Sequence, residues 1–233
     1  METAKLSNGV MMPMEGFGVF QIPEETCEQV VKDAISTGYR LIDTASSYQN
    51  EKAVGRAIQS SGVPREELYQ EGKIRAIGVC NFLPDRLLDL CYNAKILPQV
   101  NQIERHPHYQ RMEELSLMQE MNVQPEAWAP FAEGLKGMFT EPVLLEIAKK
   151  YGKTPAQVIL RWNVQQGVIV IPKSVHKERM EENLDIWDFH LDKEDMEKIS
   201  ALDKDCPSML DTRKVSEVKR VYDYLNNPVL TSL

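Results

Sequence analysis

Short apolar runs alternate along the chain with longer segments whose apolar residues recur every three or four positions. The first pattern is typical of buried strands and the second of amphipathic helices. Strands are expected over residues 15–20, 39–42, 74–79, 100–104, 123–128 and 168–171. Helices are expected over residues 23–37, 50–60, 84–94, 111–121, 141–151, 154–166, 176–183, 192–201 and 215–225, with a single helical turn at 64–70.

The order of these elements predicts an α/β fold with a parallel sheet, because strands and helices take turns from residue 15 onward. Asn8-Gly9 predicts an N-terminal β-hairpin over residues 5–14. An eight-unit (β/α) barrel needs about 250 residues. After the hairpin and the C-terminal tail, this chain has room for about six units, so we expect an incomplete barrel of the TIM type in one domain, residues 1–233.

Composition and charge exclude several classes of function. The net charge of -8 disfavours a nucleic-acid partner, and no apolar run approaches the length of a membrane span. The four cysteines have no spacing typical of a metal or redox site, so we expect free thiols, no metal and a cytoplasmic protein.

An acid and a tyrosine follow the strand that ends near Ile42. Asp43 ends the strand, and Tyr48 lies in the polar loop that leads to the next helix. Both fall at the carboxyl end of the strand, where α/β folds bind ligands. The spacing alone slightly favours the alternative interpretation, in which Asp43 is a loop cap and Tyr48 an exposed loop aromatic.

Basic residues crowd the start of the helix expected over residues 176–183. Cations oppose the helix dipole at that end, whereas helix N-termini readily bind phosphate. The cluster therefore indicates an anion site, although the acids that follow also permit a solvated charge run. Its basic members are Lys173, His176, Lys177 and Arg179.

Five stretches in the same order along the chain resemble the aldo-keto reductase family. They are Asp43-Thr44-Ala45-x-x-Tyr48-x-Asn50-Glu51, residues 72–82, Asn101-Gln102-Ile103-Glu104, residues 151–157, and Ile171-Pro172-Lys173-Ser174. The resemblance implies an eight-stranded (β/α) barrel that uses NADP(H) to interconvert small aldehydes or ketones and alcohols.

The resemblance also implies roles for individual residues. Tyr48 would be the proton donor, Asp43 its acidic partner through a lysine, and Phe20 would contact the substrate together with Tyr48. The cofactor would be held by Cys80, Asn81, Gln102, Trp128, Ala129, Lys173, Ser174, Val175, His176, Arg179, Glu182 and Asn183. Lys173 and Arg179 would hold the adenosine 2'-phosphate, which predicts NADP(H) rather than NAD(H).

The chain departs from the family pattern near residues 69–70, where the third and fourth βα units are expected to be missing. Those units carry the family's catalytic lysine and histidine. Lys52 and Lys73 are badly placed to replace the lysine, and His106 and His108 are minor alternatives for the histidine. Impaired carbonyl reduction, a nucleotide-binding pseudoenzyme and a truncated product therefore remain open. Unpaired strand edges would favour self-association by strand exchange.

Overall fold

The computed structural model describes residues 1–63, 76–211 and 213–226. The strands are β1 (Thr3–Lys5), β2 (Met11–Pro13), β3 (Phe17–Gly18), β4 (Ile42–Asp43), β5 (Gly78–Cys80), β6 (Val100–Glu104), β7 (Gln124–Trp128) and β8 (Ile169–Val170). The α-helices are α1 (Glu24–Thr37), α2 (Glu51–Ser60), α4 (Pro84–Asn93), α5 (Met112–Glu120), α6 (Pro142–Tyr151), α7 (Pro155–Gln165), α8 (Lys177–Leu184), α9 (Lys193–Ser200) and α10 (Val215–Asn226).

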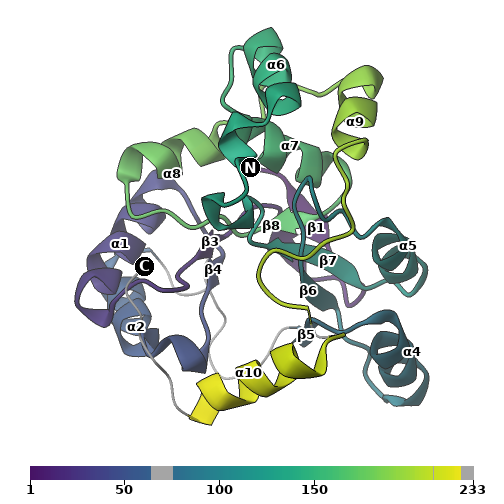
Figure 1. Ribbon diagram of the computed structural model, residues 1–233. Helices are drawn as coiled ribbons and strands as arrows, with labels where there is room; N and C mark the ends of the chain where they lie inside the picture. Colours follow the sequence, from purple (N-terminus) through teal and green to yellow (C-terminus); the bar gives the residue numbers. More distant parts are fainter. Residues whose placement is uncertain (64–75, 212, 227–233) are drawn as a thin grey trace.

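The parallel sheet predicted from the sequence is confirmed. Strands β5, β6, β7 and β8 are hydrogen-bonded in that order, and β3 pairs with β4, all in parallel. The amide of Gly16 donates to Val170 O at 2.8 Å and that of Gly18 to Pro172 O at 3.1 Å, which attaches β3 to β8. The strand order among the described residues is therefore β4, β3, β8, β7, β6 and β5 (Figure 1).

Close contact between two neighbouring segments of the sheet explains the glycine that precedes β3. A Cβ atom at Gly16 would lie 2.7 Å from the side chain of Leu41. Any larger residue would push β3 away from the segment that leads into β4.

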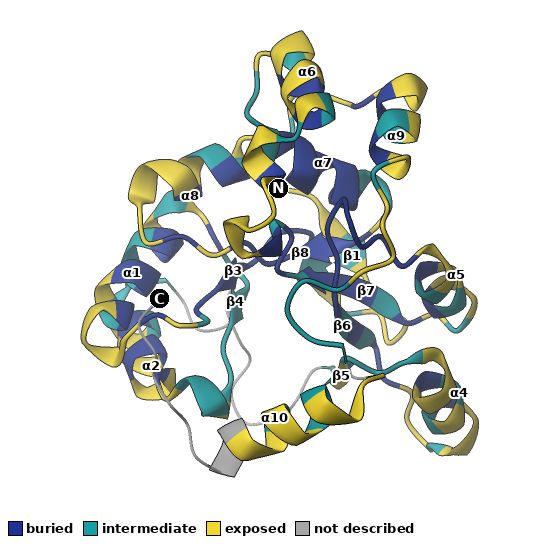
Figure 2. Cartoon of the chain, in the orientation of Figure 1, coloured by how far each residue is buried: buried dark blue, intermediate teal, exposed yellow. Residues whose placement is uncertain are grey.

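The helices surround the strands and turn their apolar faces toward them (Figures 1 and 2). One core forms between α4, α5 and α7 and strands β6 to β8, and it contains Ile103, Met118 and Leu160. A second joins α1, α2 and α8, and a third joins α6, α7 and α9. Helices α1, α2 and α4 to α9 therefore follow the apolar periodicity that predicted them, whereas α10 belongs to none of these cores and leaves Val215 and Tyr222 exposed.

Several strands are shorter than the apolar runs that predicted them. Paired backbone covers only Phe17–Gly18, Ile42–Asp43 and Ile169–Val170 of the longer runs. Regular ladder pairing is limited to these residues, although single backbone hydrogen bonds continue beyond them, as from the amide of Val19 to Asp43 O and from that of Ile171 to Ala127 O. Apolar runs mark burial, whereas the length of a strand depends on the neighbour with which it pairs. The hairpin is confirmed by the antiparallel pairing of β1 with β2. The helical turn expected at 64–70 lies outside the described residues.

Strands β4 and β5 are the two ends of the described sheet. No pairing between them is present in the part of the chain that the structure describes. The predicted absence of two βα units therefore remains a prediction.

Candidate active site

Gln102 joins two acids at the centre of the strands. Its Nε2 donates to Asp43 Oδ1 at 3.0 Å and to Glu126 Oε1 at 2.5 Å. Gln102 and Glu126 are direct partners in the register of β6 and β7, and Asp43 ends β4. The amide thus connects β4, one end of the described sheet, with β6 and β7.

The two acids lack a cation. In the described ranges neither Asp43 nor Glu126 takes part in an ion pair, and Glu126 Oε2 is buried without a hydrogen-bond partner. Burial raises the pKa of Glu126 to about 7, and the nearby charge of Asp43 adds to this while Gln102 opposes it. Burial also raises the pKa of Asp43, again against the hydrogen bond from Gln102. The acid pair therefore favours holding a proton or accepting a positive group.

Trp128 and Asn81, two residues predicted to hold the cofactor, contact each other beside Gln102. Trp128 Nε1 donates to Asn81 Oδ1 at 2.9 Å, and the backbone amide of Asn81 donates to Gln102 O at 2.8 Å. Asn81 has a φ of 58°, a left-handed conformation that asparagine tolerates better than most residues. Cys80 Sγ lies 3.7 Å from Gln102 Oε1. The structure thus brings Asp43, Cys80, Asn81, Gln102 and Trp128 together.

Tyr48 lies in the short 3-10 helix Ser46–Tyr48 after β4. Its ring is 5.1 Å from that of Phe20, centroid to centroid, and both side chains are half-buried. The pair fits the predicted substrate side of the site. Tyr48 is therefore packed rather than a fully exposed loop aromatic.

The loop after Trp128 turns sharply. Ala129 has a φ of 46° and accepts the amide of Ala132 at 2.9 Å. This conformation costs free energy for a non-glycine residue and clusters at ligand-binding loops. It supports the prediction that Ala129 lies beside a bound cofactor.

The basic cluster precedes and begins α8. Lys173, Val175, His176 and Arg179 are exposed, and neither Lys173 nor Arg179 is ion-paired within the described residues. Ser174 is buried, and its Oγ accepts the amide of His176 at 3.0 Å. The cations are therefore free to meet an anionic ligand.

Glu182 and Asn183 have contacts within the fold. Glu182 Oε1 accepts from Thr154 Oγ1 at 2.6 Å, so it ties α8 to the start of α7. Asn183 is buried and its side chain hydrogen-bonds Tyr39. These contacts favour a positioning role for both residues.

Glu104 and Glu126 are site residues that the sequence did not single out as functional. Glu104 lies two residues after Gln102 on β6 and accepts hydrogen bonds from the backbone amides of residues 208–210. His106, a minor candidate acid, is fully buried, with Nε2 3.3 Å from Glu104 and 3.0 Å from Ser208 Oγ. Glu104 lies on the same strand face as Gln102, and Glu126 lies on the same face as Trp128. This alternation along the strands was the sequence signal that could have identified both acids.

Two further properties hold for the described part of the chain. None of its helices is long and apolar enough to cross a bilayer. It also contains no group of three or more His, Cys, Asp or Glu side chains placed to hold a metal ion.

Comparison with known proteins identifies curated relatives. The chain is 35% identical over 255 aligned positions to methylglyoxal reductase DkgA of Escherichia coli, covering 86% of this chain and 93% of that protein. It is 39% identical over 260 positions to glyoxal reductase of Bacillus subtilis, covering 88% and 94%. Both alignments are longer than the 233 residues of this chain.

Solved structures agree with the sequence relatives. A metagenomic aldo-keto reductase, MGS-M4, superposes with a TM-score of 0.83 at 34% identity, covering 87% of this chain and 96% of its own. A Gox0644 mutant in complex with NADPH gives 0.78 at 30% identity, covering 86% and 93%. These neighbours assign a TIM-barrel-type α/β fold.

The model of the aldo/keto reductase family matches residues 5–69 and, separately, residues 66–204. Together the two ranges span most of the chain and contain the cluster around Gln102 and the basic residues at α8. The chain belongs to the aldo-keto reductase family.

Proposed function

We propose that this protein binds NADP(H) and reduces small aldehydes or ketones, with dicarbonyls such as methylglyoxal and glyoxal as first candidates. The observation that carries this proposal is the convergence of Asp43, Asn81 and Trp128, at or just after the carboxyl ends of their strands, around Gln102 in the middle of β6. Tyr48 follows β4 in the chain and packs against Phe20. The two substrates are those named by the relatives from Escherichia coli and Bacillus subtilis.

The chain offers suitable groups at both ends of an NADP(H) molecule. The amides of Asn81 and Gln102 and the ring of Trp128 suit a carboxamide and its flat ring. Lys173 and Arg179 are exposed cations that form no ion pair in the described ranges, although Glu133 is close enough for its carboxyl to feel the charge of Lys173. When bound, the cofactor supplies the hydride. Tyr48 would donate the proton to the carbonyl oxygen.

Activity is expected to be weak. A tyrosine has an ordinary pKa of about 10, so it needs a nearby cation or network to act near pH 7. Two features support the loss of the units that carry the family's lysine and histidine. The family model matches the chain in two ranges that meet at residues 66–69, and the relatives align over more positions than the chain has residues.

The first test measures NADPH oxidation with methylglyoxal. We expect a rate roughly 10²–10⁴ below that of an ordinary member of the family, because an unassisted general acid loses about that factor. Tyr48→Phe should abolish the residual rate and leave NADPH binding intact. Turnover at ordinary enzyme rates would contradict the impairment.

The second test measures cofactor preference through the dissociation constants of NADPH and NADH. We expect the unmutated protein to bind NADPH more tightly, and both Lys173→Ala and Arg179→Ala to remove that preference. Lys193→Ala is a matched control, since Lys193 lies on α9 and is also exposed. Equal affinity for the two nucleotides in the unmutated protein would refute the assignment.

A nucleotide-binding pseudoenzyme is the second candidate. The acid pair of Asp43 and Glu126 favours the pseudoenzyme. The described residues bring no positive group to Asp43, and a tyrosine needs a nearby cation or network to act as an acid near pH 7. Tight NADPH binding with no oxidation in the presence of any small carbonyl would support this candidate over the enzyme.

A further inference from the structure

The segment between α9 and α10 crosses the carboxyl end of β6. Residues 206–211, which we call the strap, contain no regular secondary structure. The amides of Ser208 and Met209 donate to Glu104 Oε1 at 2.6 and 3.1 Å, and that of Leu210 donates to Oε2 at 3.3 Å. Glu104 is only 1% exposed. Three successive amides thus surround one buried carboxylate.

Other contacts also hold the strap in place. Ser208 Oγ lies 3.0 Å from His106 Nε2, and Arg220 Nη2 on α10 donates to Met209 O at 2.9 Å. Hydrogen bonds to a charged group are stronger than neutral ones, and a buried carboxylate without donors is costly. Glu104 is therefore the main attachment of the strap.

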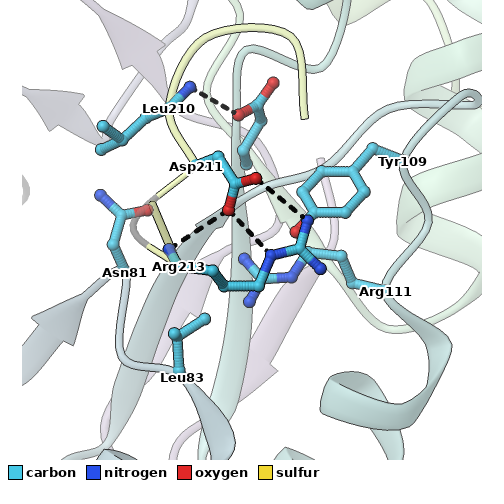
Figure 3. Close-up of a pocket in the computed structure, with 8 residues that line it drawn as sticks. Asn81, Leu83, Tyr109, Arg111, Leu210, Asp211 and Arg213 are labelled. Carbon is cyan, nitrogen blue, oxygen red and sulfur yellow. Dashed lines mark hydrogen bonds and ion pairs between the residues drawn. The ribbon is translucent and has the colours of Figure 1, made fainter. Parts of the chain in front are cut away.

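The attached strap closes the space beside Asn81. Leu210 and Asp211 lie opposite Asn81 and Leu83 around a cavity of about 10 Å³ (Figure 3). That volume holds at most about one water molecule. Asn81 Oδ1 is already bonded to Trp128. An amide-sized group has no room next to Asn81 from this side.

We propose that Glu104 holds the strap as an autoinhibitory latch, which must release before the nicotinamide end of the nucleotide reaches Asn81. This inference rests on the proposed NADP(H) function. A closed strap lowers the apparent affinity in proportion to the fraction of molecules that are open. Strap closure and nucleotide binding therefore compete.

The test uses two variants that release the strap differently. Glu104→Gln keeps the side-chain shape and removes its charge, while Met209→Pro removes one of the three donors and leaves Glu104 intact. Glu113→Gln is the matched control, because Glu113 is exposed on α5 and its loss changes the net charge equally. NADPH affinity is measured by fluorescence titration, and hydrogen exchange reports on the amides of Ser208, Met209 and Leu210.

Both release variants should bind NADPH roughly tenfold more tightly than the unmutated protein, with faster amide exchange in the strap. Glu113→Gln should change neither. Added NADPH should also speed strap exchange in the unmutated protein, because the bound state has the strap open.

Three outcomes overturn the latch. If both release variants fold but bind NADPH no more tightly than the unmutated protein, strap closure does not compete with nucleotide binding, while the cofactor proposal stands. Greater strap protection on addition of NADPH shows that the strap closes over the nucleotide instead. If no variant and no unmutated protein binds NADPH, the latch and the proposed function fail together.

Discussion

Two acids without a positive partner in the described ranges lie at the centre of the site at the scale of single residues. Asp43 and Glu126 share one amide of Gln102, and the second oxygen of Glu126 is buried alone. The folded protein therefore binds a proton at Glu126 at pH values where the unfolded chain does not, since the pKa rises from 4.5 to about 7.

This proton uptake predicts a pH-dependent stability. An acid whose pKa is raised by folding does not lower the free energy of unfolding below pH 4.5. The loss of stability grows as the pH rises toward about 7 and is constant above that. Glu126→Gln should therefore raise the free energy of unfolding at pH 8 by about 2–3 kcal/mol, with little effect near pH 4.5.

Urea unfolding at pH 5 and pH 8 checks this prediction. Glu120→Gln, on the exposed face of α5, is the control for loss of one negative charge. The same stability change at both pH values would show that Glu126 is ionised in the folded protein.

The sequence predicted only part of this residue-level picture. Asp43, Asn81, Gln102 and Trp128 were assigned to one site, and they do lie together. Glu126 shares the strand face of Trp128, but it was missed because the sequence does not show which residue of the neighbouring strand lies opposite it. Only the register of β7 against β6 places it opposite Gln102.

Helices were easier to predict than strands at the scale of elements. A helix was expected over residues 154–166, and α7 begins at Pro155 with Thr154 as its N-cap and a full capping box. Helix signals are local, so the sequence contains them. Strand limits depend on partners far along the chain, and that is why β3, β4 and β8 are shorter than their apolar runs.

The cap of α7 should contribute measurable stability. Thr154 Oγ1 accepts the amide of Gln157 at 3.3 Å and donates to Glu182 at 2.6 Å. Thr154→Ala should lower the free energy of unfolding by about 1–2 kcal/mol, because it removes the cap and leaves Glu182 without this donor.

Thermal or chemical denaturation measures the loss. Thr154→Ser keeps the hydroxyl and should retain most of the stability. If the serine variant is as unstable as the alanine variant, the methyl group rather than the cap carries the effect.

The two ends of the sheet are the main feature at the scale of the whole molecule. The apolar pattern of the sequence predicts which strands exist, but it does not determine whether β4 pairs with β5. The described residues show no pairing between these two strands. An unpaired edge presents free amide and carbonyl groups to another chain. The net charge of -8 opposes association at low ionic strength.

We therefore predict concentration-dependent self-association that increases with salt, because salt screens the repulsion while leaving edge pairing intact. Size-exclusion chromatography with light scattering, at 50 mM and 500 mM salt, measures the molar mass. A monomer at every concentration and salt level would show that the edges are not available for strand exchange.

The strap has a consequence for how freely this protein can change during evolution. Glu104 binds the strap through the backbone amides of residues 208–210, so this part of the attachment does not depend on which side chains those residues carry, whereas the contact of Ser208 Oγ with His106 does. Proline is the exception, since it has no amide hydrogen. The wall opposite Asn81 can therefore accumulate substitutions, and acquire new ligand preferences, while its anchoring to the barrel is inherited unchanged.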